Sequence, residues 1–126
     1  MPDAPVAIDP PAVVGTCLRA YHAGTSPDRA DEKAAVKATL AAITARAPGG
    51  AVEIRVPPYA AVQAIGGVRS RRGTPPAVIQ LDAQTLLQLA VGNLDWAVAM
   101  AGGRVRASGV RSDLGWLLPI FTDSAA

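Results

Sequence analysis

The residues that could perform nucleophilic chemistry lie near the N-terminus. Cys17 is the single cysteine and His22 the single histidine of the chain, and a thiol beside an imidazole is a nucleophile–base pair. On one helix, however, side chains five residues apart diverge by about 140°, because a turn takes 3.6 residues. Cys17 shares an apolar stripe with Tyr21, where a small thiol is ordinary packing. We therefore expect no catalysis from this pair, and one histidine forms neither a His dyad nor a His-based metal cluster within the chain.

A basic loop offers a different chemistry. Arg69, Arg71 and Arg72 lie in the polar stretch 68–76, together with glycine and proline. Guanidinium groups bind phosphate and carboxylate oxygens as a fork, so an oxyanion or an acidic partner is one interpretation. A solvated surface loop is the simpler interpretation, and we prefer it. Nucleic-acid binding is not expected, because such sites combine basic residues with aromatic side chains or a basic helix, and neither is present.

The remaining polar motifs are explained by turns and helix caps. The glycine pairs 66–67 and 102–103 lack the spacing of a phosphate-binding loop, and no Lys-Ser/Thr follows them. Asp82, Asp95 and Asp113 each stand where a helix is expected to begin, and a carboxylate there caps free backbone N–H groups. No carboxylate pair, metal-ligand cluster or nucleophile motif emerges. The chain is therefore predicted not to be an enzyme, with no catalytic residue, no metal site and no cofactor.

Composition places these residues in one small globular domain. Half of the 126 residues are hydrophobic and 17% are charged, which excludes intrinsic disorder. Ten acidic residues offset most of the twelve basic ones, so the net charge is +2. One cysteine allows no intramolecular disulfide, as is usual in reducing compartments. The N-terminus lacks a secretory signal pattern, and no apolar run approaches the roughly 18 residues of a membrane span. We expect a cytoplasmic protein without integral membrane association.

Hydrophobic periodicity predicts a helical hairpin followed by strands. Within residues 1–50, apolar residues recur at intervals of three and four, which is the spacing of one buried helical face. After residue 51 the pattern changes to short alternating or continuous apolar runs, which are typical of strands. Strands are expected at 52–56, 61–65, 77–81 and 104–109.

Three further helices are expected in the second half of the chain. Their predicted starts are Asp82, then Asn93 or Asp95, and finally Ser112 or Asp113. The last helix places four apolar residues at helical spacing and has Pro119 inside it: Leu114, Leu117, Leu118 and Phe121. The order of helices, strands and then mixed elements indicates an α+β domain. The hairpin 1–50 and residues 51–126 are expected to form one unit.

Residues 52–121 resemble the sterol carrier protein type 2-like superfamily, and most closely its compact bacterial branch. The resemblance is carried by a leucine-rich stretch ending in glycine (85–92), a short helical stretch (93–100) and the segment GGRVRASG (102–109), in that order. The stretch VEIRVPPYAAVQ at 52–63 is similar to the bacterial branch. The resemblance implies a curved, mostly antiparallel sheet of four to five strands with helices on one face. It also implies an apolar cavity that holds sterols, fatty acyl chains or similar lipids in characterised members.

The expected function is non-enzymatic binding of a lipid, sterol or fatty-acyl-like ligand in a pocket between sheet and helices. The apolar residues expected to line the pocket are Val62, Leu86, Leu89, Trp96, Met100, Val105, Leu114, Leu117, Leu118 and Phe121. The alternative interpretation of the same residues is that they form the hydrophobic core and line no pocket. Larger members carry an extra hairpin and a Trp-containing strand where this chain has loop 68–76, and only five residues follow Phe121. The alternative is therefore an open groove that docks a partner protein or a second copy as a homodimer, in an interaction or accessory module.

Overall fold

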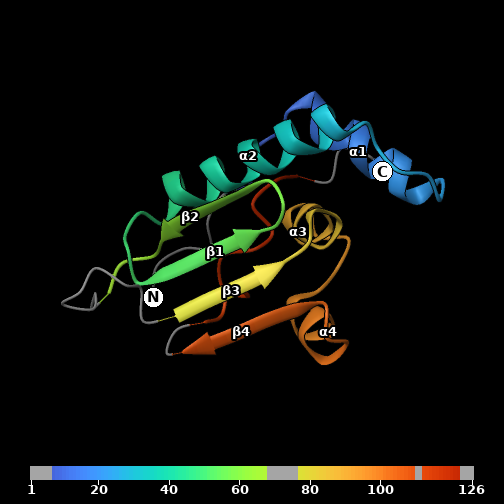
Figure 1. The fold of residues 1–126 in the computed structure, drawn as a ribbon. Helices are drawn as coiled ribbons and strands as arrows, with labels where there is room; N and C mark the ends of the chain where they lie inside the picture. The colour runs from blue at the N-terminus through green and yellow to red at the C-terminus, as the bar shows by residue number, and fades with distance from the viewer. Residues whose placement is uncertain (1–6, 68–76, 110–111, 123–126) are drawn as a thin grey trace.

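The computed structural model describes residues 7–67, 77–109 and 112–122, so the loop with Arg69, Arg71 and Arg72 lies outside the described residues (Figure 1). In these ranges the chain forms four helices and four strands. Their bounds are α1 (Ala12–His22), α2 (Arg29–Arg46), β1 (Val52–Val56), β2 (Ala60–Ala64), β3 (Ala77–Leu81), α3 (Ala83–Ala90), α4 (Trp96–Ala101) and β4 (Val105–Gly109).

The strands form one mixed sheet in the order β2-β1-β3-β4. β1 is antiparallel to β2 and parallel to β3, and β3 is antiparallel to β4. Two of the three pairings are thus antiparallel, and two N-terminal helices precede the sheet (Figure 1). The α+β fold predicted from the sequence is confirmed.

The two faces of the sheet differ in polarity. In β1, Val52, Ile54 and Val56 are buried, whereas Glu53 and Arg55 alternate with them on the other face. β3 repeats this alternation, because every second side chain of a strand points to the same face. α2 packs against β2 and α3, and α1 packs against α2 and α3 (Figure 1). The helices therefore cover one face of the sheet and leave the other face to polar residues.

Aspartate side chains begin three of the helices. Asp28 accepts hydrogen bonds from two backbone N–H groups of α2, Asp82 accepts one from Thr85 in α3, and Asp95 accepts one from the backbone of α4. These bonds satisfy N–H groups that have no partner inside the helix. The predicted caps Asp82 and Asp95 are confirmed, and their helices start where the sequence indicated.

The helix predicted after Ser112 or Asp113 is wrong. The segment forms a single turn, in which the N–H groups of Leu117 and Leu118 donate to the carbonyl of Leu114. It then runs extended, and Phe121 pairs with Ile8 in a parallel bridge. The physical reason is Pro119, which has no N–H to donate and whose ring blocks a continuing helix. The apolar spacing indicated burial, and Leu114, Leu117 and Phe121 are buried, but by a turn followed by an extended segment and not by a helix.

Candidate functional site

Nine of the ten predicted lining residues lie in one hydrophobic cluster. Six are buried, three are partly buried and packed against the buried ones, and Met100 lies outside the cluster with 38% of its surface exposed. They come from β2, α3, α4, β4 and the C-terminal segment 112–122. The fold thus brings together side chains that are almost sixty positions apart in the sequence.

This cluster is closely packed in the structure. Leu86 and Leu114 have no accessible surface, and Leu117 has 1%. A side chain with no accessible surface touches no space wide enough for a water molecule. An apolar ligand among these residues would have to displace part of the cluster.

The edge of the cluster at α4 carries exposed apolar side chains. Val98 is 61% exposed and Trp116 57% exposed, while Trp96 is half-buried. Trp96 lies against the C-terminal turn so closely that a Cβ added to Gly115 would come within 3.2 Å of its indole ring. α4 contributes one buried residue, Ala99. Among the described residues, this edge therefore combines exposed apolar side chains with a short helix that buries one residue.

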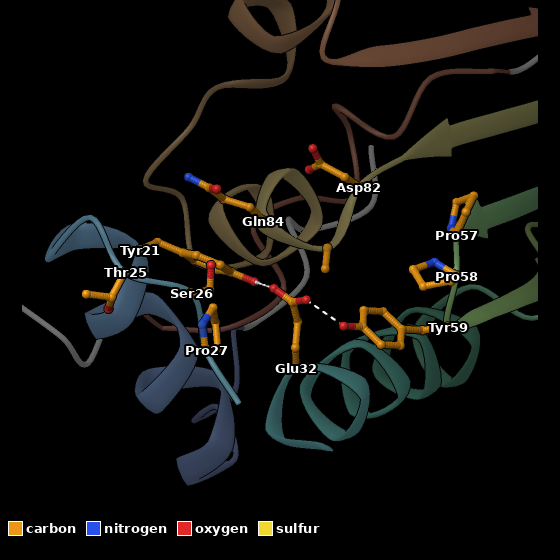
Figure 2. Close-up of a pocket in the computed structure, with 11 residues that line it drawn as sticks. Tyr21, Thr25, Ser26, Pro27, Glu32, Pro57, Pro58, Tyr59, Asp82 and Gln84 are labelled. Carbon is orange, nitrogen blue, oxygen red and sulfur yellow. Dashed lines mark hydrogen bonds between the residues drawn. The ribbon is translucent and has the colours of Figure 1, made fainter. Parts of the chain in front are cut away.

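A separate pocket of about 340 Å³ lies where the N-terminal helices, the β1–β2 turn and the start of α3 meet (Figure 2). Pro57 and Pro58 end β1, and the N–H of Tyr59 closes the turn on the carbonyl of Val56. The pocket is lined by Tyr21, Thr25, Ser26, Pro27, Glu32, Pro57, Pro58, Tyr59, Asp82, Ala83 and Gln84. None of these residues belongs to the lining set predicted from the sequence.

The carboxylate of Glu32 joins the two walls of this pocket. One of its oxygens accepts a hydrogen bond from the hydroxyl of Tyr21 at 2.5 Å, and the other accepts one from the hydroxyl of Tyr59 at 2.6 Å (Figure 2). Burial, followed by the hydrogen bond to Glu32, raises the pKa of Tyr21 far above its ordinary value. The bond to Glu32 is the main cause of the raised pKa of Tyr59. Both phenols therefore remain protonated donors at neutral pH.

The pocket is electrostatically negative. Within the part of the chain that the structure describes, its lining contains the carboxylates of Glu32 and Asp82 and no lysine, arginine or histidine. Glu32 forms no ion pair within 4.0 Å among the described residues, where the single ion pair joins Arg55 and Glu53. Arg29 lies outside the lining, with its guanidinium carbon 5.9 Å from the centre of the Tyr59 ring.

The thiol behind this pocket is not an activated nucleophile. Cys17 is fully buried, and His22, from which no catalysis was expected, is exposed on another side of α1. Burial, helped by the negative charges of Glu32 and Asp31, raises the pKa of the Cys17 thiol to about 11. The reactive thiolate is thus a minor species at neutral pH.

Comparison with known families identifies the chain. The model of the family described as bacterial SCP orthologues, a sterol carrier protein-like family, matches residues 28–120. The chain belongs to this family. No curated protein matches it. The match includes α2, so the family pattern begins earlier than residue 52, where the resemblance was placed from the sequence.

The apolar cluster contains residues that the sequence analysis singled out, whereas the tyrosine–glutamate pocket was not predicted. Tyr21 was interpreted as part of an apolar stripe, and Glu32 contributes a first-turn carboxylate to α2. Glu32 accepts hydrogen bonds from Tyr21, 11 positions before it, and from Tyr59, 27 positions after it. No local spacing carries that information.

Within the residues that the structure describes, neither a metal-ligand cluster nor a helix able to span a membrane is present. No three His, Cys, Asp or Glu side chains in these ranges lie together as metal ligands would. In the same ranges, no helix has the length and apolar content needed to cross a membrane.

Proposed function

We propose that this chain binds a lipid, sterol or fatty-acyl-like ligand, without catalysing a reaction, in an apolar pocket between the sheet and the helices. The observation that carries the proposal is membership of the bacterial SCP orthologue family, which suggests a lipid-carrier role. The part of the hydrophobic core that holds nine of the ten predicted lining residues is the region of matching chemistry. Burial of apolar surface is the main driving force for such binding.

Ligand entry is proposed at the edge formed by α4 and segment 112–122. This cover contains a six-residue helix and a segment without a regular helix or strand. The segment is held to α3 through one acceptor, because the N–H groups of Ile120 and Phe121 both donate to the carbonyl of Ala90. Local opening costs least where few backbone hydrogen bonds and few buried side chains must separate. Leu117, Leu118 and Phe121 would then exchange their contacts with the core for contacts with the ligand.

The described residues that could act as nucleophile, base or acid are not arranged for catalysis. The thiol of Cys17 is buried and protonated, and His22 is exposed elsewhere on α1. Glu32 is hydrogen-bonded to two tyrosines that keep their protons. A cytoplasmic location is part of the proposal, because a single buried thiol suits a reducing compartment.

A second candidate function is docking of a partner protein or a second copy through the same edge. Exposed tryptophan, valine and methionine side chains on neighbouring elements support it, since contiguous exposed apolar residues mark interaction surfaces. In this case the cluster stays closed, and Val98, Met100 and Trp116 contact the other chain.

The test is a titration with a fluorescent fatty acid, followed by tryptophan emission. Trp96 and Trp116 are the two tryptophans of the chain, and both lie at the proposed entry. We expect a saturable change in tryptophan emission with a micromolar dissociation constant, which corresponds to a binding free energy of about −8 kcal/mol. No saturable change with acyl, sterol or detergent-like probes would refute the carrier function. Dimerisation without ligand, measured by sedimentation, would favour the docking function.

Neighbouring residues of β2 supply a matched pair of variants. Val62 pairs with the buried Ile54 and therefore lies on the helix-covered face, whereas Ala61 is exposed on the other face. Val62→Gln should weaken fatty-acid binding several-fold, and Ala61→Gln should leave it unchanged. Equal effects of the two substitutions would place the ligand outside the predicted pocket.

A further inference from the structure

We propose that the pocket between Tyr21, Glu32 and Tyr59 binds a small organic cation that carries a primary ammonium group. This site is lined by none of the apolar residues predicted to bind lipid, although Tyr21, Tyr59 and Ala83 also pack in the hydrophobic core. The proposal does not depend on the binding of a hydrophobic ligand. Its volume of about 340 Å³ is at the small end of ligand pockets. The occupant is therefore a compact molecule or the end of a larger one.

The first argument is charge. Among the described residues, two carboxylates line the pocket and no basic side chain does, although the chain as a whole carries a net charge of +2. Glu32 is half-buried and forms no ion pair among the described residues. A carboxylate that is partly removed from water and lacks a counter-charge attracts a cation. The guanidinium carbon of Arg29 lies 5.9 Å from the centre of the Tyr59 ring, and Arg29 does not reach Glu32 within ion-pair distance.

The second argument is the balance of hydrogen-bond donors and acceptors. Both phenol hydrogens are donated to Glu32, which leaves the lone pairs of the two tyrosine oxygens free. Each carboxylate oxygen of Glu32 accepts one bond and can accept another. Asp82 uses one oxygen to cap α3, at 2.8 Å from the N–H of Thr85. The centre of the pocket therefore presents acceptors, and an ammonium group supplies three donors.

The third argument is the shape of the walls. Three proline rings, from Pro27, Pro57 and Pro58, stand beside the polar centre together with the ring carbons of the tyrosines (Figure 2). Apolar walls around a few convergent polar groups are typical of sites for small organic molecules. They suit the alkyl chain next to an ammonium group better than they suit a hydrated inorganic cation.

The experiment compares two ligands of the same shape, n-butylammonium and n-butanol, by calorimetry and NMR titration of the full chain. Butylammonium should bind at millimolar concentration, at least tenfold more tightly than butanol, because butanol has no charge. Equal affinity of the two compounds, or no saturable signal for butylammonium, would overturn the proposal. Tyr21, Glu32 and Tyr59 would then serve the fold alone.

Three variants test whether the bound cation occupies this pocket. Glu32→Gln removes the charge and should weaken butylammonium binding about tenfold. Gln84→Lys places a tethered ammonium at the exposed rim, leaves the bonds of Glu32 intact, and should weaken binding by a similar factor. Glu53→Gln is the control, because Glu53 pairs with Arg55 outside the pocket. The cation would bind elsewhere if Glu53→Gln lowered the butylammonium affinity as much as Glu32→Gln does. Unchanged affinity in Gln84→Lys would lead to the same conclusion.

The source of the ammonium group is decided with vesicles. Phosphatidylcholine vesicles with and without phosphatidylethanolamine are compared in a flotation assay, with butylammonium as competitor. Recruitment that depends on phosphatidylethanolamine and is displaced by butylammonium identifies a lipid headgroup. Binding of butylammonium without such recruitment identifies a free amine.

Discussion

The apolar cluster and the tyrosine–glutamate pocket are built in opposite ways. The cluster gathers many apolar side chains from the helices, the sheet and the C-terminal segment, and most of them are buried. The pocket relies on one carboxylate that holds two phenols from separate elements, and every one of these groups stays in contact with the surface. Burial of apolar surface therefore stabilises the first region, whereas hydrogen bonds between particular side chains stabilise the second. A substitution that affects one region strongly should affect the other weakly.

The largest effect on stability is expected from truncation in the cluster. Phe121→Ala removes a side chain that is 2% exposed and closes the C-terminal segment over the core. The lost burial and the cavity together should cost about 3–5 kcal/mol in free energy of unfolding. Urea denaturation followed by circular dichroism measures this change. A cost below about 1 kcal/mol would show that the segment lies loosely on the core, and would make ligand entry there easier than we propose.

A smaller effect is expected from deleting one partner in the pocket. Tyr21→Phe keeps the ring and removes the hydrogen bond to Glu32. Hydrogen bonds to charged groups contribute about 1.5–3 kcal/mol, and half-burial places this one near the lower value. Equilibrium unfolding at pH 7 gives the cost. A loss as large as that of Phe121→Ala would remove the contrast between the two regions.

The Tyr21→Phe variant should also differ from the wild-type chain in how its stability depends on high pH. The pKa of Tyr21 is raised in the folded chain, so the unfolded chain releases this proton first. The stability contributed by the protonated phenol is complete below about pH 10 and falls as pH rises above the ordinary pKa of tyrosine. Unfolding curves of the wild-type chain at pH 9 and pH 11 should therefore differ more than those of Tyr21→Phe. Equal pH dependence in both chains would contradict the hydrogen bond.

The two regions also differ in how far the sequence reveals them. The strands 52–56 and 77–81 and the caps Asp82 and Asp95 were predicted because each depends on neighbours within a few residues. The terminal apolar residues were recognised, but helical spacing alone did not show that Pro119 would leave a turn and an extended segment. The pocket was not predicted, because Glu32 meets Tyr59 through the packing of α2 against the sheet. The spacing of apolar residues within one element predicts which side chains are buried. A polar site assembled from three elements depends on how those elements pack, which local spacing does not show.

The smallest effect on stability, and the most informative about function, is expected at the exposed edge of the cluster. Trp116 is 57% exposed, so Trp116→Ala should change the free energy of unfolding by less than about 0.5 kcal/mol. Trp116 nevertheless belongs to segment 112–122, which is part of the proposed entry, and an exposed tryptophan supplies a large apolar surface to whatever binds there. Fatty-acid affinity, measured with a fluorescent fatty acid because one tryptophan has been removed, should therefore fall several-fold while the unfolding midpoint stays constant. If affinity is unchanged and self-association is lost instead, the edge serves docking of a second copy, and the apolar cluster beneath it is a core that stays closed.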